Sequence, residues 1–478
     1  MKNQLIDVKI TGFSKKGNGL GAYVNEFGKE SAVEIPFAIP GDVVRARVRK
    51  WSSGTYLAVL EEVISPAPER IQPKCAHFSV CGGCRWQQLD YERQLANKEA
   101  GVKEVFKPVL SDDVDFRPAI PCNKVWGYRN KMEFSFSQDA AGKHYLGLVI
   151  DSTKGRVLDL KECHLVSSWY MDALRAIRQW WVESELAAFK PLSNTGALRT
   201  VTIREGERTG DRLVVLTVSG NPDYALEKQD IESFVAHLRD AIEPIDPNTQ
   251  FSIFLRIQQV AKGMSTNFYE MLLYGTDHIR EILNVTVDPA DGPQELHFRI
   301  SPTVFFQPNT TQAERLYSEA LQLVGIPEGA VVYDLYCGTG TLGICVATRA
   351  SQVVGIEVSP ESSLDARTNA ALNNLENVTI ISGAVRHVLP QIIDEKAYPL
   401  PDVVMVDPPR PGLDKEAMSG LLALDAPRIL YISCNPKTQA EDVAILIEHG
   451  YRIVVIQPID QFAQTAHIEN IVVLEKKR

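Results

Sequence analysis

The sequence lacks the features that would place it in a special structural class. It contains no run of about 18 apolar residues, so no transmembrane helix is expected. Its first residues, MKNQLIDVKITGF, hold no apolar signal core, which argues against secretion. Internal repeats and low-complexity segments are absent as well. These absences exclude membrane-spanning, fibrous and disordered chains, and we expect a cytoplasmic protein without a membrane partner.

Cysteine is scarce, with eight in 478 residues, which is too few for a disulfide scaffold. The length suggests about three domains. A net charge of −10 argues, taken alone, against nucleic acid, but the charge is uneven. Residues 1–60 hold nine basic residues (Lys2, Lys9, Lys15, Lys16, Lys29, Arg45, Arg47, Arg49, Lys50) and five acidic ones (Asp7, Glu26, Glu30, Glu34, Asp42). A basic head on an acidic body can bind RNA, although chance could also produce this distribution.

Residues 1–64 contain five short segments in which apolar and polar residues alternate. The segments are 7–13, 21–27, 31–37, 43–51 and 55–64. A period of two is typical of strands with one buried face. Five such strands indicate a small β-barrel of the oligonucleotide-binding type, although other small barrels fit the pattern equally well. The proline-rich segment 65–74 follows as a linker.

Residues 125–290 mix strand-like runs with two helical stretches, 167–189 and 226–242, so we expect an α+β middle domain. Within it, the segment 126–131 (Trp-Gly-Tyr-Arg-Asn-Lys) interleaves aromatic and basic residues. That composition suits single-stranded RNA, through stacking and phosphate contacts. The alternative is a strand entry with solvated charges.

The C-terminal third alternates short apolar strands with helices, which predicts an α/β domain with a parallel sheet. The first of these strands, 331–336, runs into the glycine-rich turn 337–341, and Glu357 ends the next strand. A glycine turn followed by a strand-end carboxylate fits a nucleoside ligand, because the carboxylate can accept from both ribose hydroxyls. The pattern lacks the third glycine of a dinucleotide site and favours S-adenosylmethionine.

Three further residues follow strands of the same sheet. Asp407 begins a rigid Asp-Pro-Pro-Arg loop that can present its carboxylate to a heterocycle, or it caps a helix. Cys434 follows strand 428–433, where a thiol is placed as a nucleophile, although a lone cysteine is more often buried filler. Glu469 precedes the last strand, and a lone glutamate there would ordinarily be solvated.

A cysteine cluster lies earlier in the chain. Cys75, Cys81 and Cys84 fall within ten residues, with two glycines between the last two, and Cys163 lies far downstream. Closely spaced thiols around a glycine turn suit a thiolate-held metal centre. The uneven spacing favours an iron–sulfur cluster, and four-thiolate zinc is the competing interpretation.

Five motifs together resemble the RNA uracil-5-methyltransferase family over nearly the whole chain. They are FFQPN (305–309), DLYCGTG (334–340), DPPRPG (407–412), SCNP (433–436) and HIEN (467–470). The resemblance implies that Cys434 is the nucleophile and Glu469 the proton acceptor. It places five residues on cofactor and substrate positions: Gln307, Tyr336, Thr341, Glu357 and Asp407. Thr341 stands where relatives often have asparagine, and Gly383-Ala384 lacks a side chain that could read adenine.

The expected chemistry explains these residue types. Uracil C5 is too weak a nucleophile to attack a methyl sulfonium directly, so a thiolate first adds at C6. A base must then remove the C5 proton before elimination.

The resemblance also implies a domain plan and a substrate. Residues 1–64 resemble a TRAM barrel. Residues 65–290 would form an α+β middle domain with a [4Fe–4S] cluster on Cys75, Cys81, Cys84 and Cys163. Residues 291–478 resemble a Rossmann-like S-adenosylmethionine methyltransferase domain, and residues 94–122 could pack against it. The implied function is methylation of uracil C5 in 23S rRNA, a step of rRNA processing, by a monomer. The alternatives are a tRNA uracil-5-methyltransferase, a non-catalytic RNA-binding assembly factor and a small-molecule methyltransferase.

Overall fold

The structure is a computed structural model that describes residues 3–24, 28–153, 155–260 and 266–477. Internal contacts group the chain into two compact units. The first unit comprises Met1–Lys98, Ser135–Leu165 and Phe462–Ala466, and the second comprises Glu99–Phe134, Val166–Gln461 and His467–Arg478. The domain limits expected after residues 64 and 290 stay predictions.

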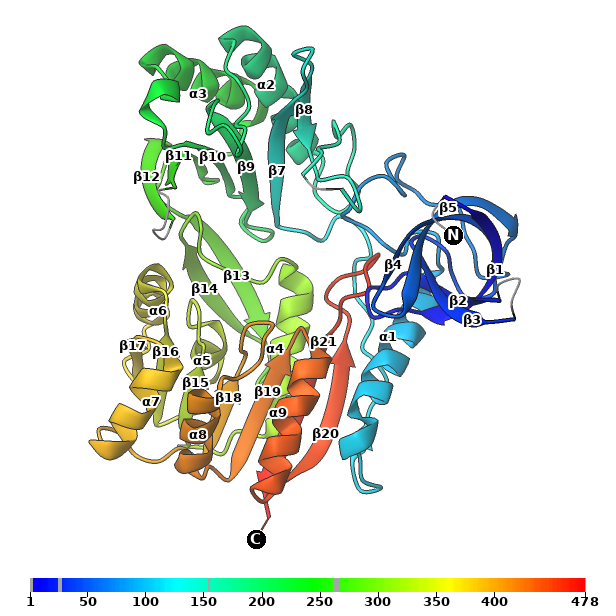
Figure 1. The fold of residues 1–478 in the computed structure, drawn as a ribbon. Coiled ribbons are helices and arrows are strands. Elements are labelled where there is room, and N and C mark those ends of the chain that lie inside the picture. The colour runs from blue at the N-terminus through cyan, green and yellow to red at the C-terminus, as the bar shows by residue number, and fades with distance from the viewer. Residues whose placement is uncertain (1–2, 25–27, 154, 261–265, 478) are drawn as a thin grey trace. The chain divides into compact units, whose positions relative to one another are not determined.

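The first unit begins with a closed five-stranded barrel in the order β1-β2-β3-β5-β4, drawn in blue in Figure 1. Its strands are β1 (Leu5–Phe13), β2 (Gly19–Val24), β3 (Glu30–Ile35), β4 (Val43–Ser52) and β5 (Thr55–Ser65). Along β1, Ile6 and Val8 are buried while their neighbours are exposed, as a half-buried strand requires. The predicted barrel is confirmed. Lys2 and residues 25–27, which include Glu26, lie outside the described residues.

Other elements of the first unit come from later in the chain. The unit holds the start of α1 (Tyr91–Phe106), the second half of β7 (Lys131–Gln138) and β8 (His144–Gly147). The second half of β7 pairs with β8 in antiparallel register, Ser135 opposite Gly147.

The second unit contains an α+β region and a two-stranded ribbon. Its sheet has the order β12-β11-β10-β9 followed by the first half of β7, with β12 (Asn267–Tyr274), β11 (Phe251–Gln259), β10 (Arg212–Ser219) and β9 (Leu198–Glu205). Helices α2 (Trp169–Ser184) and α3 (Lys228–Ile242) pack together, with the rings of Trp180 and Phe234 4.8 Å apart. The short helix η2 (Pro222–Tyr224) precedes α3, and the ribbon is β13 (Ile279–Val285) with β14 (Gln294–Ile300).

The largest sheet has eight strands in the order β17-β16-β15-β18-β19-β21-β20-β6. They are β17 (Val378–Ser382), β16 (Gln352–Glu357), β15 (Val331–Leu335), β18 (Val403–Val406), β19 (Arg428–Ser433), β21 (Glu469–Lys476), β20 (Tyr451–Ile459) and β6 (Asp115–Phe116). The first five are parallel, whereas β21 runs antiparallel to both β19 and β20. The predicted parallel sheet is confirmed.

Helices cover both faces of this sheet, as its nearly continuous apolar strands require. They are η1 (Lys107–Val109), α4 (Thr310–Val324), α5 (Thr341–Val346), α6 (Pro360–Leu372), α7 (Val385–Asp394), α8 (Lys415–Leu424) and α9 (Pro436–Glu448). Along β15, Val332 packs in a core cluster with residues of α4, and Tyr333 in a second cluster with residues of α7, α8 and α9. None of the helices in the described ranges has the length and apolar character that a membrane crossing requires.

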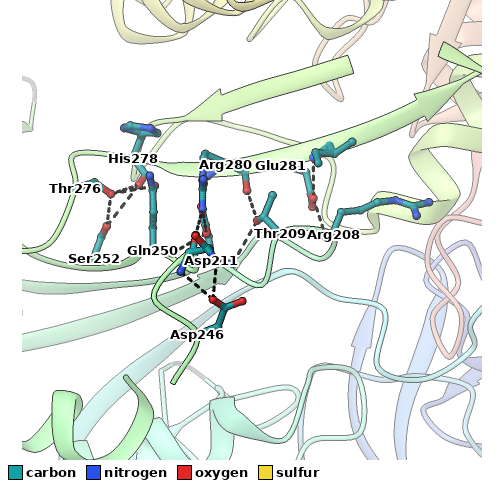
Figure 2. Close-up of polar contacts among 12 residues, drawn as sticks. Arg208, Thr209, Asp211, Asp246, Gln250, Ser252, Thr276, His278, Arg280 and Glu281 are labelled. Atoms are coloured by element: carbon teal, nitrogen blue, oxygen red, sulfur yellow. Dashed lines mark hydrogen bonds and ion pairs between the residues drawn. The ribbon is translucent and has the colours of Figure 1, made fainter. Parts of the chain in front are cut away.

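Figure 2 shows the polar contacts that join the turn after β9 to β13. Asp211 is fully buried and accepts hydrogen bonds from Nε (3.0 Å) and Nη2 (2.9 Å) of Arg280. The next residue of β13, Glu281, accepts from the backbone N–H of Arg208 (3.0 Å) and from the hydroxyl of Thr310 (2.8 Å), the first residue of α4. The turn, β13 and the start of α4 therefore form one hydrogen-bonded assembly.

Candidate active site

Strand direction brings the predicted site residues to one edge of the eight-stranded sheet. The carboxyl ends of β15, β16, β18 and β19 meet there because these strands are parallel. Strand β21 is antiparallel, so its first residue, Glu469, lies at the same edge. Ser433 at the end of β19 pairs with Asn470. The residues just beyond this pair, Cys434 and Glu469, are consequently neighbours.

The glycine turn after β15 is bound to the carboxylate that ends β16. Glu357 is largely buried and accepts hydrogen bonds from the N–H groups of Gly338 (2.9 Å) and Ser359 (2.7 Å). Gly338 has a φ of 56°, and apart from the glycine and its two chain neighbours no described residue has an atom within 4 Å of the point where a Cβ would stand. The turn therefore leaves open space beside the Glu357 carboxylate, as a nucleoside ligand requires.

Two other predicted positions flank this turn. Thr341, the first residue of α5, is largely buried, and its hydroxyl lies 2.8 Å from that of Thr339. Tyr336 is half-buried with a φ of 67°, and burial together with nearby Asp414 and Asp442 raises its pKa to about 12. The Tyr336 phenol is therefore neutral at ordinary pH.

Two carboxyl groups lie at this edge beside adjacent strands: Asp334 near the end of β15 is buried, and Asp407 just after β18 is half-buried. Burial, with smaller contributions from Asp407 and Glu357, raises the pKa of Asp334 to about 7 against the opposing effect of the Gly343 N–H, which donates to Asp334 at 2.8 Å. Burial also raises the pKa of Asp407 to about 7. The site therefore concentrates acidic groups where a cationic ligand would be stabilised.

Cys434 and Glu469 both have raised pKa values. Burial raises the pKa of the Cys434 thiol, Glu469 raises it further, and Arg410 lowers it. Glu469 is only 3% exposed, and burial followed by the nearby Asp407 raises its pKa well above the ordinary value, again opposed by Arg410. A neighbouring thiol and carboxyl whose pKa values are both raised are candidates for nucleophilic and proton-transfer roles.

Arg410 belongs to the Asp-Pro-Pro-Arg loop, which is tied to the segment after β19. The Arg410 carbonyl accepts hydrogen bonds from Asn435 Nδ2 (2.9 Å) and from the Thr438 hydroxyl (3.1 Å). These contacts hold the guanidinium near the thiol and the carboxyl. Arg410 belongs to a sequence motif that predicts no role for it. The sequence feature that could have indicated a role is a cation after two prolines, in a loop of the same sheet edge as the candidate thiol.

Gln307 lies in a loop that buried side chains hold in place. Asn130 donates from Nδ2 to the Gln307 carbonyl (2.9 Å) and to the Thr310 hydroxyl (3.0 Å), and from its backbone N–H to Pro308 (2.9 Å). The Gln307 Oε1 lies 3.5 Å from Nε2 of Gln461, which is fully buried. Asn130 and Gln461 were not among the predicted site residues, because no local pattern links them to Gln307.

The expectation that 126–131 faces RNA is wrong for two of its residues. Tyr128 is 1% exposed and Asn130 is 3% exposed, so neither can stack on a base or contact a phosphate. Lys131 is partly buried, and burial lowers its pKa to about 8, with Arg204 acting in the same direction. The segment contributes Asn130 to the support of the Gln307 loop.

The four cysteines of the predicted metal centre lie in the first unit. Burial, together with the nearby thiols of Cys163, Cys81 and Cys75, raises the pKa of Cys84 to about 12. Backbone contacts draw the loops together: the N–H of Ala76 donates to Glu162 Oε1 (2.6 Å). Within the described ranges, however, no group of three or more His, Cys, Asp or Glu side chains is placed as a metal ion requires. The structure thus brings the thiols near one another without supporting the cluster.

The parallel sheet with helices on both faces is a Rossmann-like fold of the kind found in methyltransferases. The solved structure of Pyrococcus abyssi tRNA (uracil-54, C5)-methyltransferase in complex with S-adenosyl-L-homocysteine matches with a TM-score of 0.71 at 23% identity, covering 98% of this chain and 100% of that one. Residues 253–477 match the sequence family described as tRNA (uracil-5-)-methyltransferase.

Two curated relatives extend the match over the remaining sequence. An uncharacterised RNA methyltransferase of Protochlamydia amoebophila is 54% identical over 442 residues, 92% of this chain and 99% of that protein. Another, from Clostridium tetani, is 35% identical over 450 residues, 93% of each chain. The chain therefore belongs to a family of RNA methyltransferases, and its C-terminal half carries the sequence signature of the tRNA (uracil-5-)-methyltransferases.

Proposed function

We propose that the protein methylates C5 of a uracil in 23S rRNA through a covalent adduct between Cys434 and C6 of the base. The observation that carries this proposal is the meeting of Cys434 and Glu469 at the ends of two antiparallel strands, beside Asp407 and Arg410. A thiol, a carboxyl and a cation that lie close together suit the three steps of the reaction, which are addition of the thiol to the base, removal of the proton and elimination of the thiol.

The chain's own groups carry the proton and electron movements. The Cys434 thiolate forms a bond to C6, and Arg410 favours that thiolate because it lowers the pKa of the thiol. The electron pair of the C5–C6 double bond shifts toward C5 and O4, and C5 takes the methyl group that S-adenosylmethionine supplies. The Glu469 carboxylate then accepts the C5 proton, the C5–C6 double bond reforms, and the thiolate leaves.

Glu469 suits the role of base because its pKa is raised. A carboxylate in the ordinary acidic range is a weak proton acceptor at neutral pH, whereas one with a higher pKa accepts more readily. Asp407 lies close enough to affect Glu469 and Tyr317 electrostatically, and it could accept from or donate to a planar heterocycle according to its protonation state.

The cofactor would lie along the glycine turn. The Glu357 carboxylate beside open space at Gly338 fits the ribose hydroxyls, and Thr341, Tyr336 and Gln307 complete the proposed set of cofactor and substrate contacts. The acidic residues Asp334 and Asp407 complement the positive sulfonium and amino groups of S-adenosylmethionine.

The assignment to 23S rRNA rests on the barrel and the cysteine cluster, both typical of family members that act on ribosomal RNA. We propose that the barrel is a TRAM domain, that Cys75, Cys81, Cys84 and Cys163 hold a [4Fe–4S] cluster, and that the protein acts as a cytoplasmic monomer. The cluster assignment rests on the family resemblance, and the four thiols that it requires lie near one another. Its role would be to fold the region around it, because the reaction requires no redox step.

The test is methyl transfer to defined RNA. Full-length protein with labelled S-adenosylmethionine is offered 23S rRNA or total tRNA, and nucleosides are then analysed. We expect 5-methyluridine in 23S rRNA. Product in tRNA alone would keep the chemistry and overturn the rRNA assignment, whereas no product in either RNA would favour a non-catalytic RNA-binding factor.

A further inference from the structure

The hairpin between β4 and β5 presents a large aromatic side chain to solvent. Trp51 is 52% exposed, and its ring stands edge-to-face on that of Tyr56, with centroids 4.5 Å apart and an interplanar angle of 66°. The two residues are paired across the hairpin, and Tyr56 packs against the barrel core. The indole is thus exposed and also held in position.

The basic residues along β4 fall into two groups. Arg45 and Arg47 are neutralised by carboxylates: Arg45 by Asp7 at 2.8 Å and Arg47 by Glu61 at 2.7 Å. The next two, Arg49 and Lys50, are exposed and form no ion pair with any residue that the structure describes.

The register between β4 and β5 changes next to these residues, at the point where the hairpin begins. The pairing of β4 with β5 shifts between Val48 and Lys50, and Arg49 has no partner in the ladder. Such a bulge re-aims the strand that carries it. Residues 49–56 contain no acidic residue, so the hairpin carries two positive charges beside its aromatic pair.

We propose that this hairpin, residues 49–56, binds an unpaired stretch of RNA. A base would stack on Trp51, while Arg49 and Lys50 would contact the adjoining phosphates. The proposal rests on the proposed function for the identity of the polymer and deepens it by assigning the contact to one end of the barrel. RNA fits better than a second copy of the chain, because a copy would bring two more cations to the same place.

The aromatic part of the proposal is tested with the full-length protein and a fluorescently labelled oligouridine. We expect Trp51→Ala to weaken binding about tenfold or more, since stacking one base on an aromatic ring contributes about 1–3 kcal/mol. Trp51→Phe should retain most of the affinity because it keeps a ring. The matched control is Val59→Ala, which removes an apolar side chain that is 41% exposed on β5.

The charged part is tested by salt dependence. Arg49→Gln with Lys50→Gln should lower the slope of log affinity against log salt by about 0.7 for each lost phosphate contact. Lys9→Gln, an exposed lysine on β1, should leave the slope unchanged.

Three results would overturn the proposal: equal oligouridine affinity for Trp51→Ala and the unaltered protein, equal binding of a duplex of the same length, or a change in self-association without a change in RNA binding. These measurements need no S-adenosylmethionine. If the unaltered protein shows no methylation activity, that result counts against the proposed function, and the binding test of the hairpin remains valid.

Discussion

The proposed nucleophile and base are brought together by strand direction. Cys434 follows a strand that runs toward the site edge, and Glu469 begins a strand that runs away from it. Burial and Glu469 raise the pKa of Cys434, burial and Asp407 raise the pKa of Glu469, and Arg410 opposes both shifts. At the scale of single residues, the proposed methyl transfer depends on Cys434, Glu469 and Arg410, whose charges influence one another. Single substitutions should therefore separate their roles.

Replacing the thiol and the carboxyl should cause different failures. Cys434→Ala cannot add to C6, so it should bind RNA and cofactor but give neither methylation nor a covalent complex. Glu469→Gln should still add and still transfer methyl, and then stall before elimination. Denaturing gels with labelled methyl groups should reveal a retained protein–RNA species for Glu469→Gln alone.

The size of the effect makes that experiment practical. Removing a positioned base slows its step by about 10²–10⁴-fold, long enough for the adduct to survive a gel. If both variants give only non-covalent complexes, Glu469 does not resolve the adduct, and Asp407 becomes the next candidate.

At the scale of elements, the loop before α4 is supported from the neighbouring sheet. Arg204 of β9 is 1% exposed and donates to the carbonyls of Ser301 (3.1 Å) and Val304 (2.7 Å). In the described part of the chain, no carboxylate forms an ion pair with it. Arg204 and Asn130 therefore both donate hydrogen bonds to the backbone of the segment that carries Gln307, and Glu281 binds the hydroxyl of Thr310 at its end. The α+β region thus contributes to the site through support rather than direct contact.

Thr310 offers a clean test of this support, because its hydroxyl links Glu281 to Asn130. Thr310→Val keeps the shape and removes the hydroxyl, which leaves buried polar groups with one partner fewer, a cost of about 1–3 kcal/mol. We expect a lower kcat with little change in S-adenosylhomocysteine affinity, and recovery in Thr310→Ser. A loss of thermal stability with an unchanged kcat would assign Thr310 a purely structural role.

The cysteine loop gives a second prediction at this scale. Anaerobically purified protein should be brown and contain about four irons per chain if the centre is [4Fe–4S]. Cys81→Ser should bleach it and destabilise the first unit, whereas Cys345→Ser, at a buried position in the second unit, should retain the colour. Stoichiometric zinc without visible absorbance would contradict the iron–sulfur assignment.

At the scale of the whole molecule, buried carboxyl groups link stability to pH. The pKa of Asp334 is about 7 in the folded protein and near 3.8 when exposed. Between these values the folded state holds a proton that the unfolded state has released, so this group's contribution to the free energy of unfolding falls as pH rises.

Asp334→Asn should therefore flatten part of the pH dependence of stability. Its amide oxygen can still accept from Gly343, and its charge no longer changes. Urea denaturation at pH 5 and pH 7.5 should show a smaller decrease in unfolding free energy for the variant than for the unaltered protein. The same substitution at exposed Asp394 is the control, and equal decreases in all three proteins would refute the role of Asp334.

Local patterns in the sequence determined the features that arise from neighbouring residues. Period-two alternation predicted the barrel strands, apolar runs predicted the parallel sheet, and the glycine turn with Glu357 predicted the nucleoside site. The barrel strands and the parallel sheet are confirmed because strand burial depends on a few consecutive residues, whereas the nucleoside site stays a prediction. The family motifs also placed Cys434, Glu469 and Asp407 at the ends of strands, where the structure has them.

Only the tertiary structure decided which distant residues meet. Asn130 was read as part of an RNA-facing segment, yet it is buried against the Gln307 loop, and neither Gln461 nor Arg410 was assigned a role. Strand order and the antiparallel direction of β21 create these contacts, and neither property is encoded in the spacing of nearby residues. The raised pKa values follow for the same reason, since burial and neighbouring charge exist only once the chain has folded.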